Sequence, residues 1–102
     1  CWAAIDKWEG GNYDLTEVLF SMMRLLEGVE VFILFKNADK NKVRINFRSR
    51  YFVDVNKIAK FFGGGGHKRA SGTTIEDNLN GAQKKVIEVV RRYTDNDKEL
   101  NQ

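Results

Sequence analysis

Four consecutive glycines interrupt an otherwise well-patterned chain, within the segment GGGGHKRASG that spans residues 63–72. Glycine in regular structure costs about 0.5–1 kcal/mol per position relative to alanine, because its backbone loses the most freedom on folding. Such a run is therefore expected where backbone N–H groups are exposed, or where a ligand must come close to the main chain. A flexible hinge or a tight turn is the alternative interpretation.

The residues that follow the run favour an anion as the ligand. They are His67, Lys68 and Arg69, and cations beside exposed N–H groups stabilise a phosphate. We predict a short helical turn over residues 67–71, with its N-terminal N–H groups facing the anion. P-loop and dinucleotide-binding motifs do not fit, because the run lacks a Gly-Lys-Ser/Thr ending and follows a predicted helix rather than a strand.

Positive charge is concentrated around this segment. From Lys36 to Arg69 there are ten cations and two acids, a net charge of +8, whereas the remainder has seven cations and twelve acids, a net charge of −5. The overall charge of +3 conceals this division. A basic centre in an acidic surround indicates an anion-binding surface, with an ordinary solvated face as the alternative.

A basic strand precedes the glycine run. Over residues 42–51 apolar side chains alternate with polar ones, the polar set being Lys42, Arg44, Asn46, Arg48 and Arg50. Side chains two apart on a strand lie about 7 Å from each other, a spacing that suits successive phosphates of an extended nucleotide chain. An amphipathic edge strand is the alternative for Arg44 and Arg50.

The rest of the chain predicts an α/β fold. We expect a strand over residues 1–5, a helix from Asp14 to Gly28 with Asp14 and Glu17 as its capping box, and a buried central strand over 29–35. Met22 and Met23 are both expected in the core. A turn is expected at 37–41 and a C-terminal helix over 79–93, followed by a frayed tail.

A short helix links the basic strand to the glycines. Asp54 is its predicted N-cap, and Gly63 ends it. Its expected inward-facing residues are Ile58, Ala59, Phe61 and Phe62. Together these elements predict a single α/β domain, with a mixed sheet of about four or five strands and helices packed against it.

The stretch VRINFRSRYFVDVNKIAKFFGGGGHKRASG, residues 43–72, resembles the C-terminal, DHH-associated domain (DHHA type 1) of the DHH phosphoesterase superfamily. The hallmark of that family is an Arg-Ser pair at the end of a strand, a D-V-N-x-I-A helix start and a G-G-G-H-x-x-A-x-G segment. Residues 25–35, LLEGVEVFILF, resemble its lead-in. Within the superfamily the chain is most similar to the oligoribonuclease and 3′-phosphoadenosine phosphate phosphatase branch, often labelled exopolyphosphatase-related.

The resemblance implies a set of substrate-binding residues. Arg48 would hold a phosphate with two parallel hydrogen bonds, which lysine cannot do with the same geometry. His67 would contact phosphate or base rather than a metal. The implied phosphate-binding set is Arg48, Ser49, Gly63, Gly64, Gly65, Gly66, His67 and Lys68, with secondary basic contacts from Arg44, Arg50 and Arg69.

The resemblance also implies a division of labour. Two-metal hydrolysis needs several Asp and His ligands, whereas this chain has one histidine and scattered acids, so we expect no catalytic residue and no metal ligand in residues 1–102. An N-terminal catalytic DHH domain, absent from this chain, would hold Mn²⁺ or Mg²⁺. The present domain would then bind short oligoribonucleotides, dinucleotides or nucleoside 3′,5′-bisphosphates, and be inactive in isolation.

Two other function classes stay open. Similar domains accompany alanyl-tRNA synthetase-like proteins and a single-strand DNA exonuclease, so a non-catalytic RNA, tRNA or single-stranded nucleic-acid binding module is one alternative. A structural dimerisation module, using Trp2, Trp8 and the helix faces, is the other, and a homodimer of the full-length protein stays open. The lone Cys1 cannot form an internal disulfide, and no apolar run reaches about 18 residues, so we expect a cytoplasmic protein without membrane contact from this segment.

Overall fold

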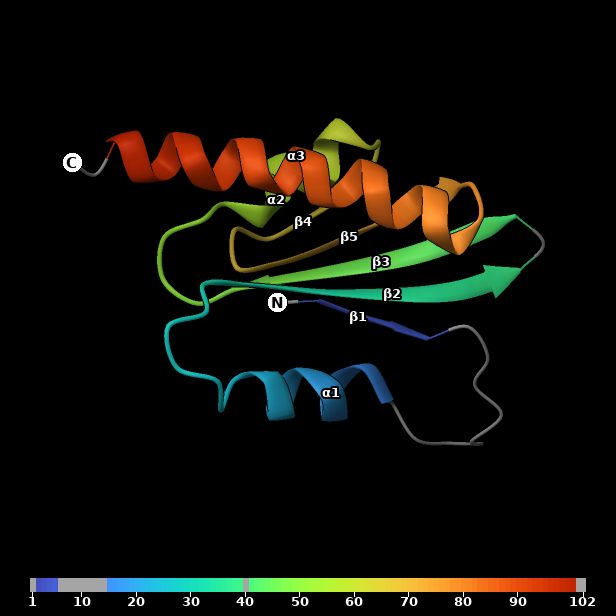
Figure 1. Ribbon diagram of the computed structural model, residues 1–102, viewed down its shortest axis with the longest axis horizontal. Helices are drawn as coiled ribbons and strands as arrows, with labels where there is room; N and C mark the ends of the chain where they lie inside the picture. The colour runs from blue at the N-terminus through green and yellow to red at the C-terminus, as the bar shows by residue number, and fades with distance from the viewer. Residues whose placement is uncertain (1, 6–14, 40, 101–102) are drawn as a thin grey trace.

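A five-stranded sheet organises the computed structural model, which describes residues 2–5, 15–39 and 41–100 (Figure 1). The strands are β1 (Trp2–Ile5), β2 (Val31–Asp39), β3 (Lys42–Ser49), β4 (Gly65–Gly66) and β5 (Ala70–Glu76). Their order across the sheet is β1-β2-β3-β5-β4. β1 runs parallel to β2 and the other neighbours are antiparallel, which confirms the predicted mixed sheet.

Helices cover both faces of the sheet. Figure 1 shows α1 (Leu15–Met23) on one side, and α2 (Val55–Phe61) and α3 (Leu79–Leu100) on the other. A large core lies on the α2 and α3 side, built from apolar residues of β2, β3 and the two helices. A small one on the α1 side is formed by Phe20, Met23, Phe32 and Leu34. The predicted α/β class is therefore confirmed.

The two central strands follow their predicted burial patterns, but β2 continues to Asp39, so the turn predicted over residues 37–41 is wrong for residues 37–39, which belong to the strand. All five residues from Val31 to Phe35 are buried, because alternate side chains enter the large and the small core. On β3, Val43, Ile45 and Phe47 are fully buried. The intervening basic residues lie on the opposite face, which is the face that α1 partly covers, so the predicted alternation is confirmed.

The first predicted helix exists but differs in two details. It ends at Met23 rather than at Gly28, because the next turn is tighter than an α-helical one. In that turn Leu25 N donates to the Met22 carbonyl at 3.2 Å. Gly28, with φ 77°, then leads into β2. Met23 is buried, whereas Met22 is 61% exposed, so the prediction that both are in the core is wrong for Met22. Adjacent helical residues point about 100° apart, and one of this pair faces away from the sheet.

Three residues named in the sequence analysis lie outside the described residues: Cys1, Trp8 and the capping-box residue Asp14. The side chains of Trp2 and Glu17 also lie outside them.

The short helix α2 begins and ends as predicted. Asp54 Oδ1 accepts hydrogen bonds from the N–H groups of Asn56 at 3.0 Å and Lys57 at 3.4 Å, and Gly63 follows the C-cap with φ 85°. The prediction that Phe61 faces inward is wrong, since its side chain is 59% exposed and packs edge-on against Phe62.

The predicted helical turn over residues 67–71 is wrong, because these residues belong to a β-hairpin. Gly65 pairs with Gly72, and His67 N donates to the Ala70 carbonyl at 2.7 Å, which leaves residues 68 and 69 as the turn. The glycines allow β4 to come this close to β5: a Cβ at Gly64 would lie 2.2 Å from the Gly72 oxygen. Strand pairing thus prevails over the helical tendency of the small residues. The helix N-terminus next to the hairpin is that of α2, whose Val55 N–H donates to the Lys68 carbonyl at 2.9 Å.

The C-terminal helix is longer than predicted. Asn78 Oδ1 accepts from Gly81 N at 2.7 Å at its start, and the helix continues to Leu100. The frayed tail predicted from residue 94 is therefore wrong up to residue 100, since that stretch contains no proline or glycine to end the helix. Within the part of the chain that is described, none of the helices combines the length and apolar character needed to cross a bilayer.

Candidate functional site

Four arginines meet at one end of the sheet, on the face that carries α1. They come from the residue that follows α1, from the end of β3 and the loop after it, and from the hairpin turn. With neighbouring aromatic and small residues they line a pocket of about 540 Å³, formed by Phe20, Arg24, Phe32, Arg48, Ser49, Arg50, Tyr51, Arg69 and Ala70. We call it the arginine pocket. None of the described residues that line it is acidic, so the pocket attracts anions.

Two buried phenyl rings form the floor of the arginine pocket. The guanidinium carbon of Arg48 lies 5.2 Å from the ring centre of Phe20, and that of Arg50 lies 5.5 Å from the ring centre of Phe32. A guanidinium held by its flat face against a ring keeps its N–H groups pointing along its edge. The floor therefore orients two cations without occupying all of their hydrogen-bond donors.

Ser49 and Arg69 hold the loop after β3 against the hairpin. Ser49 Oγ donates to the Val53 carbonyl at 2.6 Å, and Arg69 Nη1 donates to the same carbonyl at 2.7 Å. Arg69 Nη1 also donates to Ser49 Oγ at 3.3 Å. Both side chains thus have main-chain partners that position the pocket wall, and the substrate contacts predicted for them stay predictions.

Glu30 fixes the same loop from the other side. Its carboxylate accepts hydrogen bonds from three consecutive N–H groups, those of Tyr51 at 2.9 and 3.1 Å and of Phe52 and Val53 at 3.0 Å each. Arg50 N in turn donates to the Glu30 carbonyl at 2.9 Å. The loop backbone over residues 50–53 is therefore anchored at every residue.

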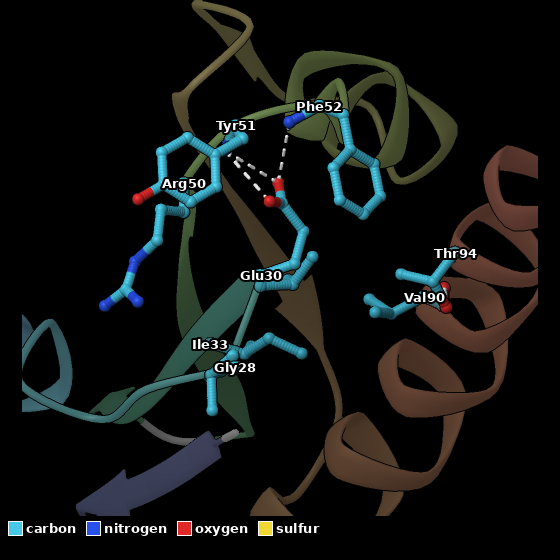
Figure 2. A pocket seen from close by; sticks show the side chains of 10 residues that line it. Gly28, Glu30, Ile33, Arg50, Tyr51, Phe52, Val90 and Thr94 are labelled. Atoms are coloured by element: carbon cyan, nitrogen blue, oxygen red, sulfur yellow. Dashed lines mark hydrogen bonds between the residues drawn. The ribbon is translucent and has the colours of Figure 1, made fainter. Parts of the chain in front are cut away.

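A second pocket, of about 550 Å³, lies on the α3 side of this loop (Figure 2). Its walls come from the start of β2, the loop and α3, and it is lined by Gly28, Val29, Glu30, Val31, Ile33, Arg50, Tyr51, Phe52, Val90 and Thr94. Arg50 and Tyr51 line both pockets. The loop thus straddles the end of the sheet, and the mostly apolar second pocket lacks the cluster of cations found in the first.

Three of the four glycines in the run are explained by the fold. Gly63 has φ 85°, and a Cβ at Gly64 or Gly66 would come within 3.0 Å of β5 backbone atoms. Gly65 differs: its φ is not in the left-handed region, and a Cβ there would have only Asn56 Oδ1 within 4 Å, at 3.8 Å. That oxygen is buried without a hydrogen-bond partner. A Cβ at Gly63 would also meet open space, so Gly65 is the glycine of the run that neither its φ nor a clash requires, and its backbone is open to close approach.

The structure places His67 in the same row of the sheet as Arg48. His67 pairs with Ala70 across the hairpin turn, and Ala70 pairs with Arg48 across β5 and β3. Two strand spacings separate His67 from Arg48, roughly 10 Å. His67 and Lys68 are exposed, and neither lines the arginine pocket. A ligand that meets both Arg48 and His67 must extend from the arginine pocket to the hairpin turn.

The predicted residues are therefore only partly brought together. Arg48, Ser49, Arg50 and Arg69 share the arginine pocket, whereas Arg44 lies farther along β3, with its guanidinium over Gly72. Arg24 was missed by the sequence analysis, although it follows Phe20 by one helical turn, a spacing that could have indicated it. Glu30 was missed as well, because a single acidic residue before a strand is not a pattern that indicates a functional role.

Among the residues that the structure describes, no three His, Cys, Asp or Glu side chains lie together in a way that could hold a metal ion. Asp77 lies just before α3 and forms an ion pair with Lys85. A hydrogen bond from Lys85, whose Nζ lies 2.6 Å from Asp77 Oδ2, and a further one from the Asn78 N–H lower the pKa of Asp77. Asp77 does not line the arginine pocket.

Comparison with known proteins gives a family match and similar folds. The DHHA1 domain family matches residues 4–93. The bifunctional oligoribonuclease and PAP phosphatase NrnA of Thermus thermophilus is 31% identical over 84 residues, which cover 81% of this chain and 26% of that protein. The chain thus spans about a quarter of this relative.

Two solved structures have a similar fold. An exopolyphosphatase-related protein from Bacteroides fragilis has a TM-score of 0.64 and 20% identity, over 97% of this chain and 29% of that one. The pGpG-specific phosphodiesterase PggH from Vibrio cholerae has a TM-score of 0.55 and 14% identity, over 91% of this chain and 33% of that one. At these identities the likeness shows the shared architecture.

Proposed function

This chain belongs to the DHHA1 domain family, and from that premise we propose that it binds the phosphate groups of a nucleotide or short oligonucleotide in the arginine pocket, as the substrate-binding part of a metal-dependent phosphoesterase. The observation that carries the proposal is the meeting of four arginines in one pocket without an acidic residue in its lining. Guanidinium groups match phosphate oxygens with parallel, charge-assisted hydrogen bonds.

Each part of the site has a role in this proposal. Arg48, oriented by Phe20, is the main phosphate ligand, and Arg50 and Arg24 add positive charge to the same pocket. Ser49 and Arg69 keep the loop in place while contributing to the rim. The open backbone at Gly65 and the exposed side chains of His67 and Lys68 would meet the remainder of the ligand, such as its base or a second phosphate.

The similar proteins suggest which ligands to test. One is named as an oligoribonuclease and PAP phosphatase, and another as a pGpG-specific phosphodiesterase. Short oligoribonucleotides, dinucleotides and nucleoside 3′,5′-bisphosphates are therefore the proposed substrate class. We place hydrolysis, with Mn²⁺ or Mg²⁺, in an accompanying catalytic DHH domain, since the chain spans 26% of the curated relative. A cytoplasmic location and a homodimer belong to the same proposal.

Calorimetric titration with adenosine 3′,5′-bisphosphate and a dinucleotide tests the phosphate site. Arg48→Ala removes a charge-assisted contact worth about 1.5–3 kcal/mol, so affinity is expected to fall roughly 10- to 150-fold. Arg91→Ala, which removes an exposed arginine on α3 outside the pocket, is the matched control and should bind like the parent. Melting temperatures separate binding from folding. Parental affinity in a folded Arg48→Ala variant would overturn the assignment.

The second candidate function is a non-catalytic module for RNA or single-stranded nucleic acid. The observation in its favour is that basic residues continue along the same face beyond the pocket, since Lys36 of β2 is paired with Arg44 of β3. A longer strand would follow this row with successive phosphates. Affinity that rises steadily with oligonucleotide length beyond two nucleotides would support the module, and affinity that levels off at two would support the phosphoesterase.

A further inference from the structure

Tyr51 presents a large aromatic ring to solvent at the edge of the arginine pocket. Its side chain is 74% exposed, although its backbone N–H is held by both oxygens of Glu30. We propose that Tyr51 is a stacking platform for a nucleobase, whose attached phosphate lies in the arginine pocket. This inference rests on the proposed function and adds a recognition element for the base.

The ring is held on a rigid support. Glu30 binds the N–H groups of residues 51–53, and Arg69 and Ser49 bind the Val53 carbonyl. The preceding residue, Arg50, is fixed by a hydrogen bond from its guanidinium to the Arg24 carbonyl and by its position over Phe32. Because the backbone is already ordered, stacking on Tyr51 costs little conformational entropy beyond that of two side-chain torsions.

The two aromatic residues of the loop point to opposite sides. Figure 2 shows Tyr51 and Arg50 on one side, and Phe52 directed toward α3 on the other. Tyr51 lines both pockets, whereas Phe52 lines only the apolar pocket on the α3 side. Tyr51 is therefore the aromatic residue of this loop that lines the arginine pocket, and Phe52 provides a matched comparison in the same loop.

An exposed aromatic ring beside arginines suits a nucleotide. Arginines hold the phosphate, and an aromatic face accepts any base by stacking, which contributes a sequence-tolerant share of affinity in single-strand binding proteins. Another protein segment covering Tyr51 is the competing explanation for the exposed ring. The two explanations differ in one respect: stacking distinguishes a ligand that carries a base from one that does not.

Two ligands that differ only in the base provide the test. Adenosine 5′-monophosphate and ribose 5-phosphate are titrated by calorimetry into the parent chain and into Tyr51→Ala, Tyr51→Phe and Phe52→Ala. Loss of one stacked base weakens binding by roughly 5- to 150-fold. We expect that loss for Tyr51→Ala with adenosine monophosphate and no change with ribose phosphate. Tyr51→Phe and Phe52→Ala should bind both ligands like the parent.

Each remaining outcome overturns a defined part of the argument. Tyr51 is not a stacking platform if the parent binds adenosine monophosphate and ribose phosphate with equal affinity. The same conclusion follows if Tyr51→Ala leaves the affinity for adenosine monophosphate unchanged, or weakens the binding of both ligands alike. In each of these cases the phosphate pocket stands. If the parent binds neither ligand, the phosphate pocket fails together with the platform. Equal melting temperatures of the parent and Tyr51→Ala confirm that folding does not account for the difference.

Discussion

Alanine substitution along the glycine run should separate the glycines that the hairpin requires from the one that a ligand requires. At Gly64 an added Cβ would lie 2.2 Å from the Gly72 oxygen and 2.6 Å from Thr73 Cβ. Overpacking against backbone costs about 1–3 kcal/mol, and 1 kcal/mol lowers the melting temperature of a domain of this size by about 4–8 °C. Gly64→Ala is therefore expected to melt at least about 4 °C below the parent.

Gly65→Ala should behave in the opposite way. The nearest atom to its added Cβ is Asn56 Oδ1 at 3.8 Å, and its φ is not in the left-handed region. Replacing such a glycine restricts the unfolded chain and stabilises by about 0.4–1 kcal/mol, so its melting temperature should equal or exceed that of the parent. At Gly63 an added Cβ would meet open space, but φ is 85°. Gly63→Ala should therefore lower the free energy of unfolding by about 1–2 kcal/mol, and this loss measures the cost of the backbone conformation alone.

Nucleotide affinity completes this series. If a phosphate or sugar contacts the backbone at Gly65, the added methyl overlaps with it and costs about 1–3 kcal/mol, a roughly 5- to 150-fold loss measured by calorimetry. Differential scanning calorimetry supplies the stabilities. A Gly65→Ala variant that melts as low as Gly64→Ala would refute the hairpin geometry. A stable Gly65→Ala variant with parental affinity would leave the run with a purely structural role.

Three further outcomes are expected. The 102-residue chain should show no phosphodiesterase activity with Mn²⁺ or Mg²⁺, and turnover that copurifies with it through repeated chromatography would contradict the division of labour. Arg44→Gln should make the slope of log K against log salt shallower by about 0.7 for a single strand, and an unchanged slope would assign Arg44 to a solvated face. Because the pKa of Asp77 is lowered from 3.8, its ion pair should add stability that is fully present above that pH and lost as pH falls through the lowered pKa. Lys85→Met should return the pKa toward 3.8 in an NMR titration, and an unchanged midpoint would exclude Lys85 as the cause.

Elements whose burial alternates along the chain could be predicted from the sequence. The pattern of β3 placed Val43, Ile45 and Phe47 in the core, and the unbroken apolar run of β2 indicated a strand between two layers. The limits of α2 were also predicted, because Asp54 and Gly63 act through contacts within a few residues. Local chemistry is sufficient in each of these cases.

Features that depend on distant segments could not be predicted. Residues 67–71 have no strong local preference, and their strand geometry comes from pairing with residues of β3 about twenty positions earlier. The orientation of α1 is similar: it carries apolar residues on more than one side, and contact with Phe32 and Leu34 selects Phe20 and Met23 as the buried ones. Sequence spacing alone does not decide between such faces.

The candidate site shows the same division. Arg48 and Ser49 were indicated by the resemblance to the DHH-associated domain, whose Arg-Ser pair they match, and the structure brings them to the pocket. Arg24 and Tyr51 were not assigned, because their proximity to Arg48 results from the sheet order and from the packing of α1. Glu30 acts through main-chain N–H groups more than twenty residues away, for which the sequence contains no pattern.

The arginine pocket is built across the contact between α1 and the sheet, which makes it a locally cooperative unit. Among the described residues, Phe20 and Met23 are buried against Phe32 and Leu34 of β2, whereas Val18 and Met22 of the same helix are at least half exposed. We expect helix α1 to open locally, at a lower free energy than the global unfolding of the domain. Opening would carry Phe20 and Arg24 away from Phe32 and Arg48 and so dismantle the pocket. A ligand that bridges these walls would protect the amide hydrogens of α1 from exchange. At a concentration one hundred times its Kd, it would raise the free energy of opening by about 2.7 kcal/mol.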